Sequence, residues 1–247
     1  MFEAETGSRA GAHPLDALIH HALSGRQRRF AVPTGRVLRF PPEVAPCAAM
    51  PDATPASFEA LRESIPQHGP AALTTVAAIE PPTAFTVLRR ATLLQMIGAR
   101  VPGSDRPAPA LPGQARLGAG RGGRRAGPAR ADGEDPTGAV RPAHDRTGYL
   151  SRGAPAGSAG GASGRAGERL QIDGYAEISA VCVDPGFRGQ GLATGLMARL
   201  MALIRARGEV PILHVLASNH NAISLYRTLG FVVRREVHLT VLDCAAD

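Results

Sequence analysis

The sequence contains no lysine and no tryptophan, and all 28 of its basic residues are arginine. The absence of lysine excludes a P-loop nucleotide site, whose glycine-rich loop ends in lysine followed by serine or threonine. The three cysteines, Cys47, Cys182 and Cys244, are scattered and form no C-x-x-C pair. This pattern argues against a disulfide framework or a zinc site and indicates a reducing compartment. We therefore expect no metal.

Long apolar runs are also lacking. No stretch reaches the roughly 20 apolar residues that a membrane-spanning helix needs, and the start of the sequence, MFEAE, does not resemble a signal peptide. We expect a soluble, cytoplasmic protein without a membrane partner. The net charge is +7 over 247 residues. Because arginine alone supplies the positive charge in a chain rich in alanine, glycine and proline, a GC-rich gene accounts for it before a nucleic-acid ligand does.

One stretch stands out for its order of elements. Residues 177–183 are apolar and β-branched, as in a strand, and Asp184-Pro185-Gly186 breaks that strand. A glycine-rich loop at 188–193 then leads into an amphipathic helix at 190–207. A helix N-terminus with free N–H groups binds anions, above all phosphate. The dinucleotide fingerprint G-x-G-x-x-G fails here by one position, and an ordinary glycine-rich turn is the alternative.

The rest of the patterned sequence falls into two parts. Residues 1–12 are expected to be a disordered tail, and residues 13–100 a small N-terminal α/β region without a chemical motif. Within that region we predict helices at 13–23 and 56–65 and strands in 29–40, 71–79 and 86–97. The third part, residues 170–247, continues after the 190–207 helix with a strand at 211–217. A helix capped by Ser218 or Asn219 and ended by Gly230 follows, and then a strand at 231–242.

Two motifs in this last part resemble the GNAT superfamily of acyl-CoA-dependent N-acetyltransferases. The first is Arg188-x-x-Gly191-x-Ala193 in the glycine-rich loop. The second is Asn219-x-x-Ala222-x-x-Leu225-Tyr226-x-x-x-Gly230-Phe231 in the later helix. The resemblance covers residues 172–242. The strand sequence EISAVCV is similar to that of the FR47-like branch. The resemblance implies an α/β (α+β) fold in which a mixed, twisted sheet is flanked by helices.

The resemblance also implies a site for acetyl-CoA as co-substrate. The family's central strand carries a bulge and splays from the next strand, so that pantetheine can pair with the backbone of Val181, Cys182 and Val183. The pyrophosphate would lie on the loop and helix start, with Asn219 as a further contact. The residues of that loop and helix start are Arg188, Gly189, Gln190, Gly191, Leu192 and Ala193.

Acyl transfer from a thioester to an amine needs a neutral amine, a polarised carbonyl and a proton for the leaving thiolate. A backbone N–H near Val181 could polarise the carbonyl. Tyr226 holds the family's proton-donor position, and a packing role is its alternative. Glu177 is the candidate proton acceptor, directly or through water, and a salt-bridged strand residue is its alternative. Cys182 has apolar neighbours and no nearby histidine in the sequence, so we expect it to be buried rather than nucleophilic.

Residues 101–169 differ from both flanking parts. They are rich in glycine, proline, alanine and arginine, with Tyr149 as the one aromatic residue. Such a segment buries too little apolar surface to order itself. It reads as a flexible linker or as an Arg/Gly-rich nucleic-acid-binding segment. A third interpretation is a shifted reading frame over about residues 104–166. Shifted by one base, residues 135–164 can read as alternating TYLGV and RLVALAG, like two strands that the GNAT half otherwise lacks.

Three functional hypotheses follow. The leading one is an N-acetyltransferase that passes an acetyl group from acetyl-CoA to a primary amine by direct attack in a ternary complex. The acceptor would be a small-molecule or peptide amine rather than a nucleic acid. The alternatives are a nucleic-acid-binding protein acting through its Arg/Gly segment and an inactive GNAT relic. The sequence leaves the acceptor and the oligomeric state open.

Overall fold

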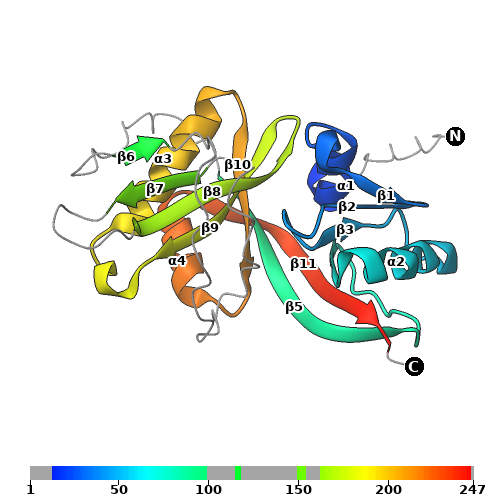
Figure 1. The fold of residues 1–247 in the computed structure, drawn as a ribbon. Coiled ribbons are helices and arrows are strands. Elements are labelled where there is room, and N and C mark those ends of the chain that lie inside the picture. Colours follow the sequence, from blue (N-terminus) through cyan, green and yellow to red (C-terminus); the bar gives the residue numbers. More distant parts are fainter. Residues whose placement is uncertain (1–12, 99–114, 118–148, 154–161, 246–247) are drawn as a thin grey trace, which may run out of the picture.

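A computed structural model describes residues 13–98, 115–117, 149–153 and 162–245 (Figure 1). The expected tail at 1–12 and most of the 101–169 segment lie outside these residues. The helices are η1 (Pro14–Ala17), α1 (Leu18–Ser24), η2 (Arg28–Phe30), α2 (Pro55–His68), η3 (Pro185–Phe187), α3 (Leu192–Ala206) and α4 (His220–Thr228). The strands are β1 (Val32–Thr34), β2 (Val37–Arg39), β3 (Cys47–Ala49), β4 (Ala71–Thr75), β5 (Phe85–Gly98), β6 (Ala115–Leu117), β7 (Tyr149–Gly153), β8 (Ala162–Ile172), β9 (Tyr175–Val183), β10 (Val210–Leu216) and β11 (Phe231–Cys244).

The strands form one mixed sheet in the order β1-β2-β3-β4-β11-β5-β10-β9-β8-β7-β6. The β3–β4 and β9–β10 pairs are parallel, and each is joined through a helix, α2 in the first case and α3 in the second. The other pairs are antiparallel. The predicted mixed α/β fold with flanking helices is confirmed.

The two longest strands are exchanged between the two halves of the chain. β5 leaves the N-terminal half and pairs with β10, with Leu93 opposite Leu216. β11 ends the C-terminal half and pairs with β4, with His238 opposite Thr75. β5 and β11 also pair with each other and run side by side from one lobe to the other (Figure 1). The last strand of each half therefore completes the sheet of the other half.

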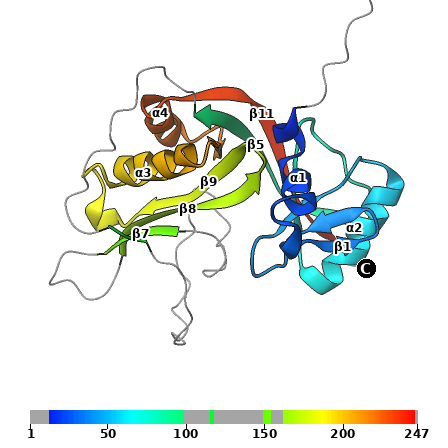
Figure 2. The ribbon, with the colours of Figure 1, turned by 90° about the horizontal axis from the view of Figure 1, so that it is seen from above.

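Side chains alternate across the C-terminal part of the sheet and pack into separate clusters on its two faces. On β10, Leu213 and Val215 pack in the cluster of α3 and α4, whereas Ile212 packs in the cluster of η1 and α1. Figure 2 shows α3 running along β8 and β9, with α1 placed between β8 and the N-terminal strands. The sheet around β9 and β10 is thus covered on one face by C-terminal helices and on the other by the N-terminal region.

The N-terminal lobe has a core of its own beneath α2. The helix places Phe58, Leu61 and Ile65 on one face, at the spacing that predicted it, and all three are buried. They pack with Phe85 at the start of β5 and Leu242 near the end of β11. Because Leu242 comes from the C-terminal half, the exchanged strands supply part of this core.

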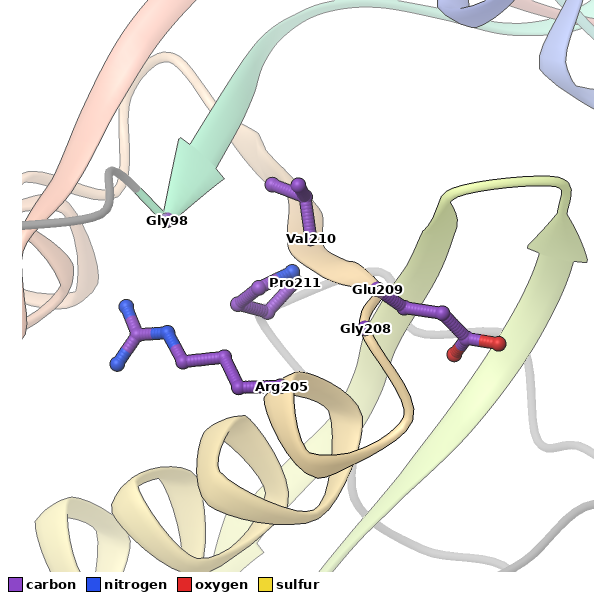
Figure 3. Close-up of a pocket in the computed structure, with 6 residues that line it drawn as sticks. All are labelled: Gly98, Arg205, Gly208, Glu209, Val210 and Pro211. Atoms are coloured by element: carbon purple, nitrogen blue, oxygen red, sulfur yellow. The ribbon is translucent and has the colours of Figure 1, made fainter.

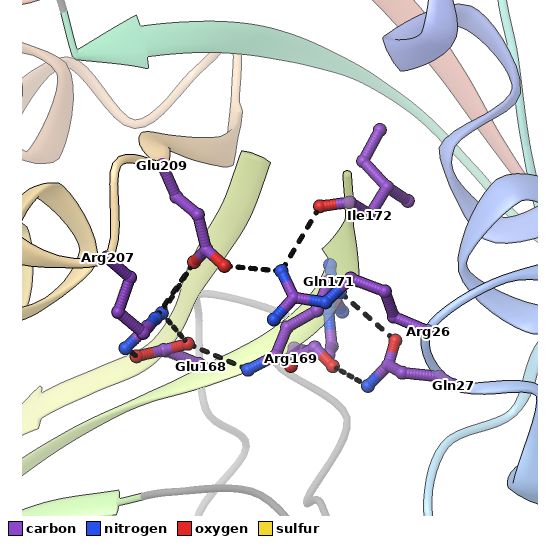
Figure 4. Close-up of polar contacts among 8 residues, drawn as sticks. All are labelled: Arg26, Gln27, Glu168, Arg169, Gln171, Ile172, Arg207 and Glu209. Atoms are coloured by element: carbon purple, nitrogen blue, oxygen red, sulfur yellow. Dashed lines mark hydrogen bonds and ion pairs between the residues drawn. The ribbon is translucent and has the colours of Figure 1, made fainter. Parts of the chain in front are cut away.

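Polar side chains attach the residues after α1 to the C-terminal half (Figure 4). Gln27 is 5% exposed, and its amide donates to the carbonyl of Arg169 at 2.9 Å and accepts from the N–H of Gln171 at 3.1 Å. The Gln27 amide thus satisfies backbone groups of β8 on the edge that β7 no longer pairs with. Arg26 forms an ion pair with Glu209 beside it.

A second arginine extends this cluster within the C-terminal half. Arg207, just after α3, binds Glu168 of β8 at 2.7 Å and Glu209 at 2.8 Å. Both carboxylates are nearly buried, with 8% of their surface exposed. The cluster in Figure 4 joins α1, β8 and the start of β10 through alternating charges.

Strand β8 begins inside the segment for which composition predicts no order. Its small residues fit a crowded place rather than a flexible one, because Ala166 is fully buried and Gly164 lies under α3. A Cβ at Gly164 would lie 3.2 Å from both the carbonyl of Cys182 and a methyl group of Leu196. Composition therefore misled the prediction for residues 162–169. Strand β3 was not predicted either, because its three small residues carry no strand pattern.

Candidate functional site

The parallel strands β9 and β10 separate partway along their length. They pair at only three positions, and the last pair is Glu177 with Ile212. Both strands continue beyond it, to Val183 and to Leu216. Past the last pair, the edge of β9 that faces β10 has peptide groups outside the ladder. The splay implied by the family resemblance is present, with its vertex at Glu177 and Ile212.

A bulge in β9 lies three residues beyond the vertex. Ser179 is opposite Gly167, but Cys182 is opposite Arg165, so β9 has one residue more than β8 over this interval. Ala180 lies in the bulge with φ of 53°, and it is the only described non-glycine residue with positive φ. This conformation costs about 1–2 kcal/mol for a residue with a Cβ. Strained backbone of this kind is typical of functional sites.

The glycine-rich loop and the start of α3 form an open cradle of backbone. Gly189 and Gly191 have φ of 75° and 73°, and nothing lies within 4 Å of a Cβ built on either. Gly191 caps α3 without a side-chain hydrogen bond, and the first turn contains no acidic residue. Arg188 and Gln190 are exposed beside these glycines. The N–H groups at this helix end are available to an anion.

The other predicted loop and strand residues anchor this cradle. Leu192 is buried at the start of α3, and Ala193 is half-buried. Val181 packs against the same core, and Val183 is also half-buried. The strand that should carry pantetheine therefore packs against the core under α3, and the start of α3 is anchored by a buried leucine.

The expectation that Cys182 is buried is wrong. It is exposed rather than buried, because the splay leaves this end of β9 without a neighbour on one side. The Nε of Arg165 donates to its Sγ at 3.2 Å. The apolar residues next to Cys182 in the sequence lie at the end of β9, at the edge of the site, so they do not bury the thiol.

Helix α4 places the second motif. Asn219 is the N-cap, and its Oδ1 accepts from the N–H of Ala222 at 3.1 Å. Tyr226 packs against the α3 cluster and lies edge-on to Phe231, with the ring centres 6.1 Å apart. Burial raises the pKa of the phenol, so it is protonated at neutral pH. Among the described residues, none forms a hydrogen bond with its hydroxyl.

Glu177 lies at the vertex with three donors around it. Arg169 donates to both carboxylate oxygens, at 3.0 and 2.7 Å, and the Nδ1 of His214 lies 2.8 Å from Oε1. The side chain is 1% exposed. Burial raises the pKa of this carboxyl group, but Arg169 and His214 outweigh burial and lower it to about 2. This geometry matches the salt-bridged alternative and leaves Glu177 a weak base without direct access to an amine.

Nothing along the chain indicates that His214 takes part, because no partner for it is visible in the sequence. In the structure its Nε2 lies 3.0 Å from the amide Nε2 of Gln95 on β5. The Oε1 of Gln95 in turn accepts from Arg234 at 2.7 Å. Pairing of β10 with β5 brings these residues together, and the exchange of β5 could not be read from the sequence.

A small cavity of about 120 Å³ opens at the other end of β10 (Figure 3). The residues around it are Gly98, Arg205, Gly208, Glu209, Val210 and Pro211. It lies where β10 begins, before the three paired positions, so it is separate from the splay and from the glycine-rich loop. Among the described residues, no group of three or more His, Cys, Asp or Glu side chains is arranged to hold a metal ion. None of the described helices has the length and apolarity needed to traverse a bilayer.

Comparison with known proteins relates this chain to GNAT-family proteins. The family model described as FR47-like protein matches residues 159–239. A solved structure of a GNAT-family protein from Novosphingobium aromaticivorans is 30% identical, with a TM-score of 0.73, over 95% of this chain and 100% of that one. A GCN5-related N-acetyltransferase from Kribbella flavida shares the fold at 19% identity and a TM-score of 0.52, over 91% and 92% of the two chains. No curated protein matches the sequence.

Proposed function

Because the chain belongs to the GNAT superfamily of acyl-CoA-dependent acetyltransferases, in its FR47-like branch, we propose that it transfers an acetyl group from acetyl-CoA to a primary amine. The transfer is a direct attack in a ternary complex. The observation that carries the proposal is the splay of β9 from β10 next to an uncapped glycine-rich helix start. These two features fit the pantetheine arm and the pyrophosphate of an acyl-CoA molecule.

The residues present suit acetyl-CoA, which supplies the acetyl group as a thioester. The open cradle at Gly189 and Gly191 admits a pyrophosphate close to the backbone, and Arg188 adds positive charge. The peptide groups of Val181, Cys182 and Val183 are the partners for pantetheine along the splayed edge. Asn219 contributes by starting α4 at the proper place, because its side-chain oxygen is engaged as a cap.

Two groups of the chain act on the reacting atoms. The N–H of Val181, which follows the bulge at Ala180, stabilises negative charge that develops on the thioester oxygen. Tyr226 gives its proton to the departing sulfur, since the phenol is protonated at neutral pH and no described residue bonds to its hydroxyl.

Glu177 is enclosed by Arg169 and His214 and has a pKa of about 2, so the amine arrives as the free base and the proton that its nitrogen loses on acylation passes to solvent water. For Glu177 we propose a role at the vertex, in line with the salt-bridged alternative, rather than the role of proton acceptor. The acceptor is a small-molecule or peptide amine. The protein works in the cytoplasm, where its three free cysteines stay reduced.

The test combines calorimetric titration of acetyl-CoA with thiol release in the presence of a panel of amines. Two glycines serve as a matched pair, since Gly191 and Gly174 both have positive φ and open space around a Cβ. Gly174 lies in the turn between β8 and β9, away from the cradle. Gly191→Ala should weaken acetyl-CoA binding, and Gly174→Ala should not, at a similar cost in stability. A wild-type chain that binds no acetyl-CoA refutes the proposed function.

A further inference from the structure

A row of polar side chains crosses the sheet at the vertex of the splay. It consists of Glu177 on β9, His214 on β10, Gln95 on β5 and Arg234 on β11. Side chains alternate along strands, and Ile212, two residues before His214, packs in the α1 cluster. The row therefore lies on the face that α1 covers, opposite α3 and α4.

The donors and acceptors in this row have one consistent assignment. Arg234 can only donate, so the Gln95 atom 2.7 Å from its Nη1 is the amide oxygen. The Gln95 amide nitrogen donates to the carbonyl of Leu15 at 3.0 Å and faces the Nε2 of His214 at 3.0 Å. That Nε2 must therefore accept. The imidazole is neutral, and its Nδ1 carries the proton that it donates to Glu177.

All three side chains at the centre of the row are removed from water. The His214 and Glu177 side chains are 6% and 1% exposed, and Gln95 is 1% exposed. Buried polar groups are costly unless they are fully paired. Here each group is paired, so the row is a fixed element of the structure and not a set of adaptable surface contacts.

The position of His214 relative to the ladder suggests what the row does. The last backbone pair between β9 and β10 joins Ile212 to Glu177, and His214 is two residues further along β10. Its bond to Glu177 therefore reaches back across the gap just where the strands separate. Gln95 holds the other side of the imidazole to β5, the neighbour of β10 on its opposite edge.

We propose that His214 is a positioning residue for acetyl transfer: its neutral imidazole fixes the vertex of the splay by binding Glu177 on β9 and Gln95 on β5. The inference rests on the proposed function. The place where β9 leaves β10 sets the course of β9 into its bulge, and so the direction of the N–H of Val181. A change of about 1 Å in such a group can cost about a hundredfold in rate.

The experiment compares three variants of the full chain. His214→Leu removes both bonds of the imidazole, and His214→Asn keeps a donor at the position of Nδ1 but loses the contact with Gln95. His238→Leu is the matched control, because His238 is a half-buried histidine on β11, in the same sheet. The dissociation constant of acetyl-CoA and the kcat of acetylation are measured below the unfolding temperature of every variant.

For His214→Leu we expect kcat to fall about tenfold or more with little change in acetyl-CoA affinity, because the phosphate cradle is untouched. His214→Asn should recover most of the lost kcat, and His238→Leu should resemble the wild type. Unchanged kcat in folded His214→Leu overturns the inference. An equal loss in His214→Asn overturns it too, because the bond to Glu177 would then not be the operative one.

A second measurement does not depend on activity. Nitrogen NMR of the histidine side chains identifies which ring nitrogen of His214 bears the proton in the neutral form. A proton on Nδ1 supports the inference, and a proton on Nε2 overturns it. A wild-type chain that acetylates no amine refutes the proposed function and the catalytic part of the inference together. Acetylation with normal kcat in His214→Leu refutes the inference alone.

Discussion

Arg169 donates a hydrogen bond to each oxygen of the Glu177 carboxylate, at 3.0 Å from Nε to Oε2 and 2.7 Å from Nη2 to Oε1. The pair makes folding depend on pH, because the pKa of Glu177 falls from 4.5 to about 2 in the folded chain. The stabilisation is complete above pH 4.5 and is lost as the pH falls through 2. We expect this group to lower the free energy of unfolding by up to about 3 kcal/mol between pH 6 and pH 2. Chemical denaturation across that range measures it.

Glu177→Gln should remove this acid dependence and weaken the protein at pH 7. It removes a charge-assisted pair between the Arg169 side chain, which is 33% exposed, and a buried carboxylate, which typically costs about 1–3 kcal/mol. Glu59→Gln is the control, because Glu59 pairs with Arg62 at 2.8 Å on the exposed surface of α2, and we expect it to change little. Equal destabilisation by the two substitutions would contradict the prediction.

Tyr226→Phe tests the proton donor. Loss of a general acid lowers kcat by roughly 10²–10⁴-fold, and stability should hardly change, because no described residue bonds to the hydroxyl. Tyr175→Phe is the control, since Tyr175 packs against the α1 cluster at the far end of β9. Steady-state kinetics and thermal unfolding separate the two effects. A Tyr226→Phe enzyme with wild-type kcat would rule out this role.

The elements that were predicted well from the sequence share one property. Each has a local pattern of apolar residues that indicates a helix or a strand without knowledge of its partners. Helices α2, α3 and α4 and strands β9, β10 and β11 all lie within the predicted stretches or extend them by a few residues. The partners of these elements could not be predicted in the same way. The exchange of β5 and β11 and the contact of Gln27 with β8 arise from tertiary pairing between residues far apart in the sequence.

Ala180 offers a test of the strained bulge. Glycine adopts positive φ without a Cβ clash, so Ala180→Gly should raise the free energy of unfolding by up to about 1 kcal/mol. Ala180→Val should lower it, because a β-branched residue is least tolerant of this conformation. Denaturant unfolding of both variants provides the measurement. If both substitutions destabilise equally, strain is not what governs this position.

The three cysteines should react at different rates with a thiol reagent. Cys182 is exposed, whereas Cys47 is buried and burial raises the pKa of its thiol. We expect Cys182 to be modified first and acetyl-CoA to slow its modification, because Cys182 lies on the splayed edge of β9. Mass spectrometry after brief labelling identifies the site, with Cys182→Ala as control. Equal labelling of Cys182 with and without acetyl-CoA would argue against pantetheine on this edge.

The shifted reading frame over residues 104–166 remains a prediction with its own test. Strand β7 covers the five positions at which the shifted text reads TYLGV, a pattern that suits a strand better than the YLSRG found there. A chain with that frame restored should unfold at a higher temperature than the present one. Resequencing the gene is the decisive control, because a clean single frame shared by close relatives would remove the hypothesis.

Only part of the candidate site could be predicted from the sequence. The cradle and α4 follow from local signals: two glycines with positive φ, an asparagine cap and a tyrosine at a motif position. The state of Glu177 does not, because its pKa depends on Arg169 and on His214, which is 37 positions away. The exposure of Cys182 likewise depends on where β9 and β10 part.

The exchange of β5 and β11 has a consequence for synthesis of the protein. During translation β4 and β5 emerge early, but β11, the strand that both of them need, follows only after α4. Until then the edges of β4 and β5 remain open to pairing with other chains. The N-terminal lobe of a nascent chain is therefore incomplete until β11 has been synthesised. A product truncated before residue 231 would be prone to aggregate.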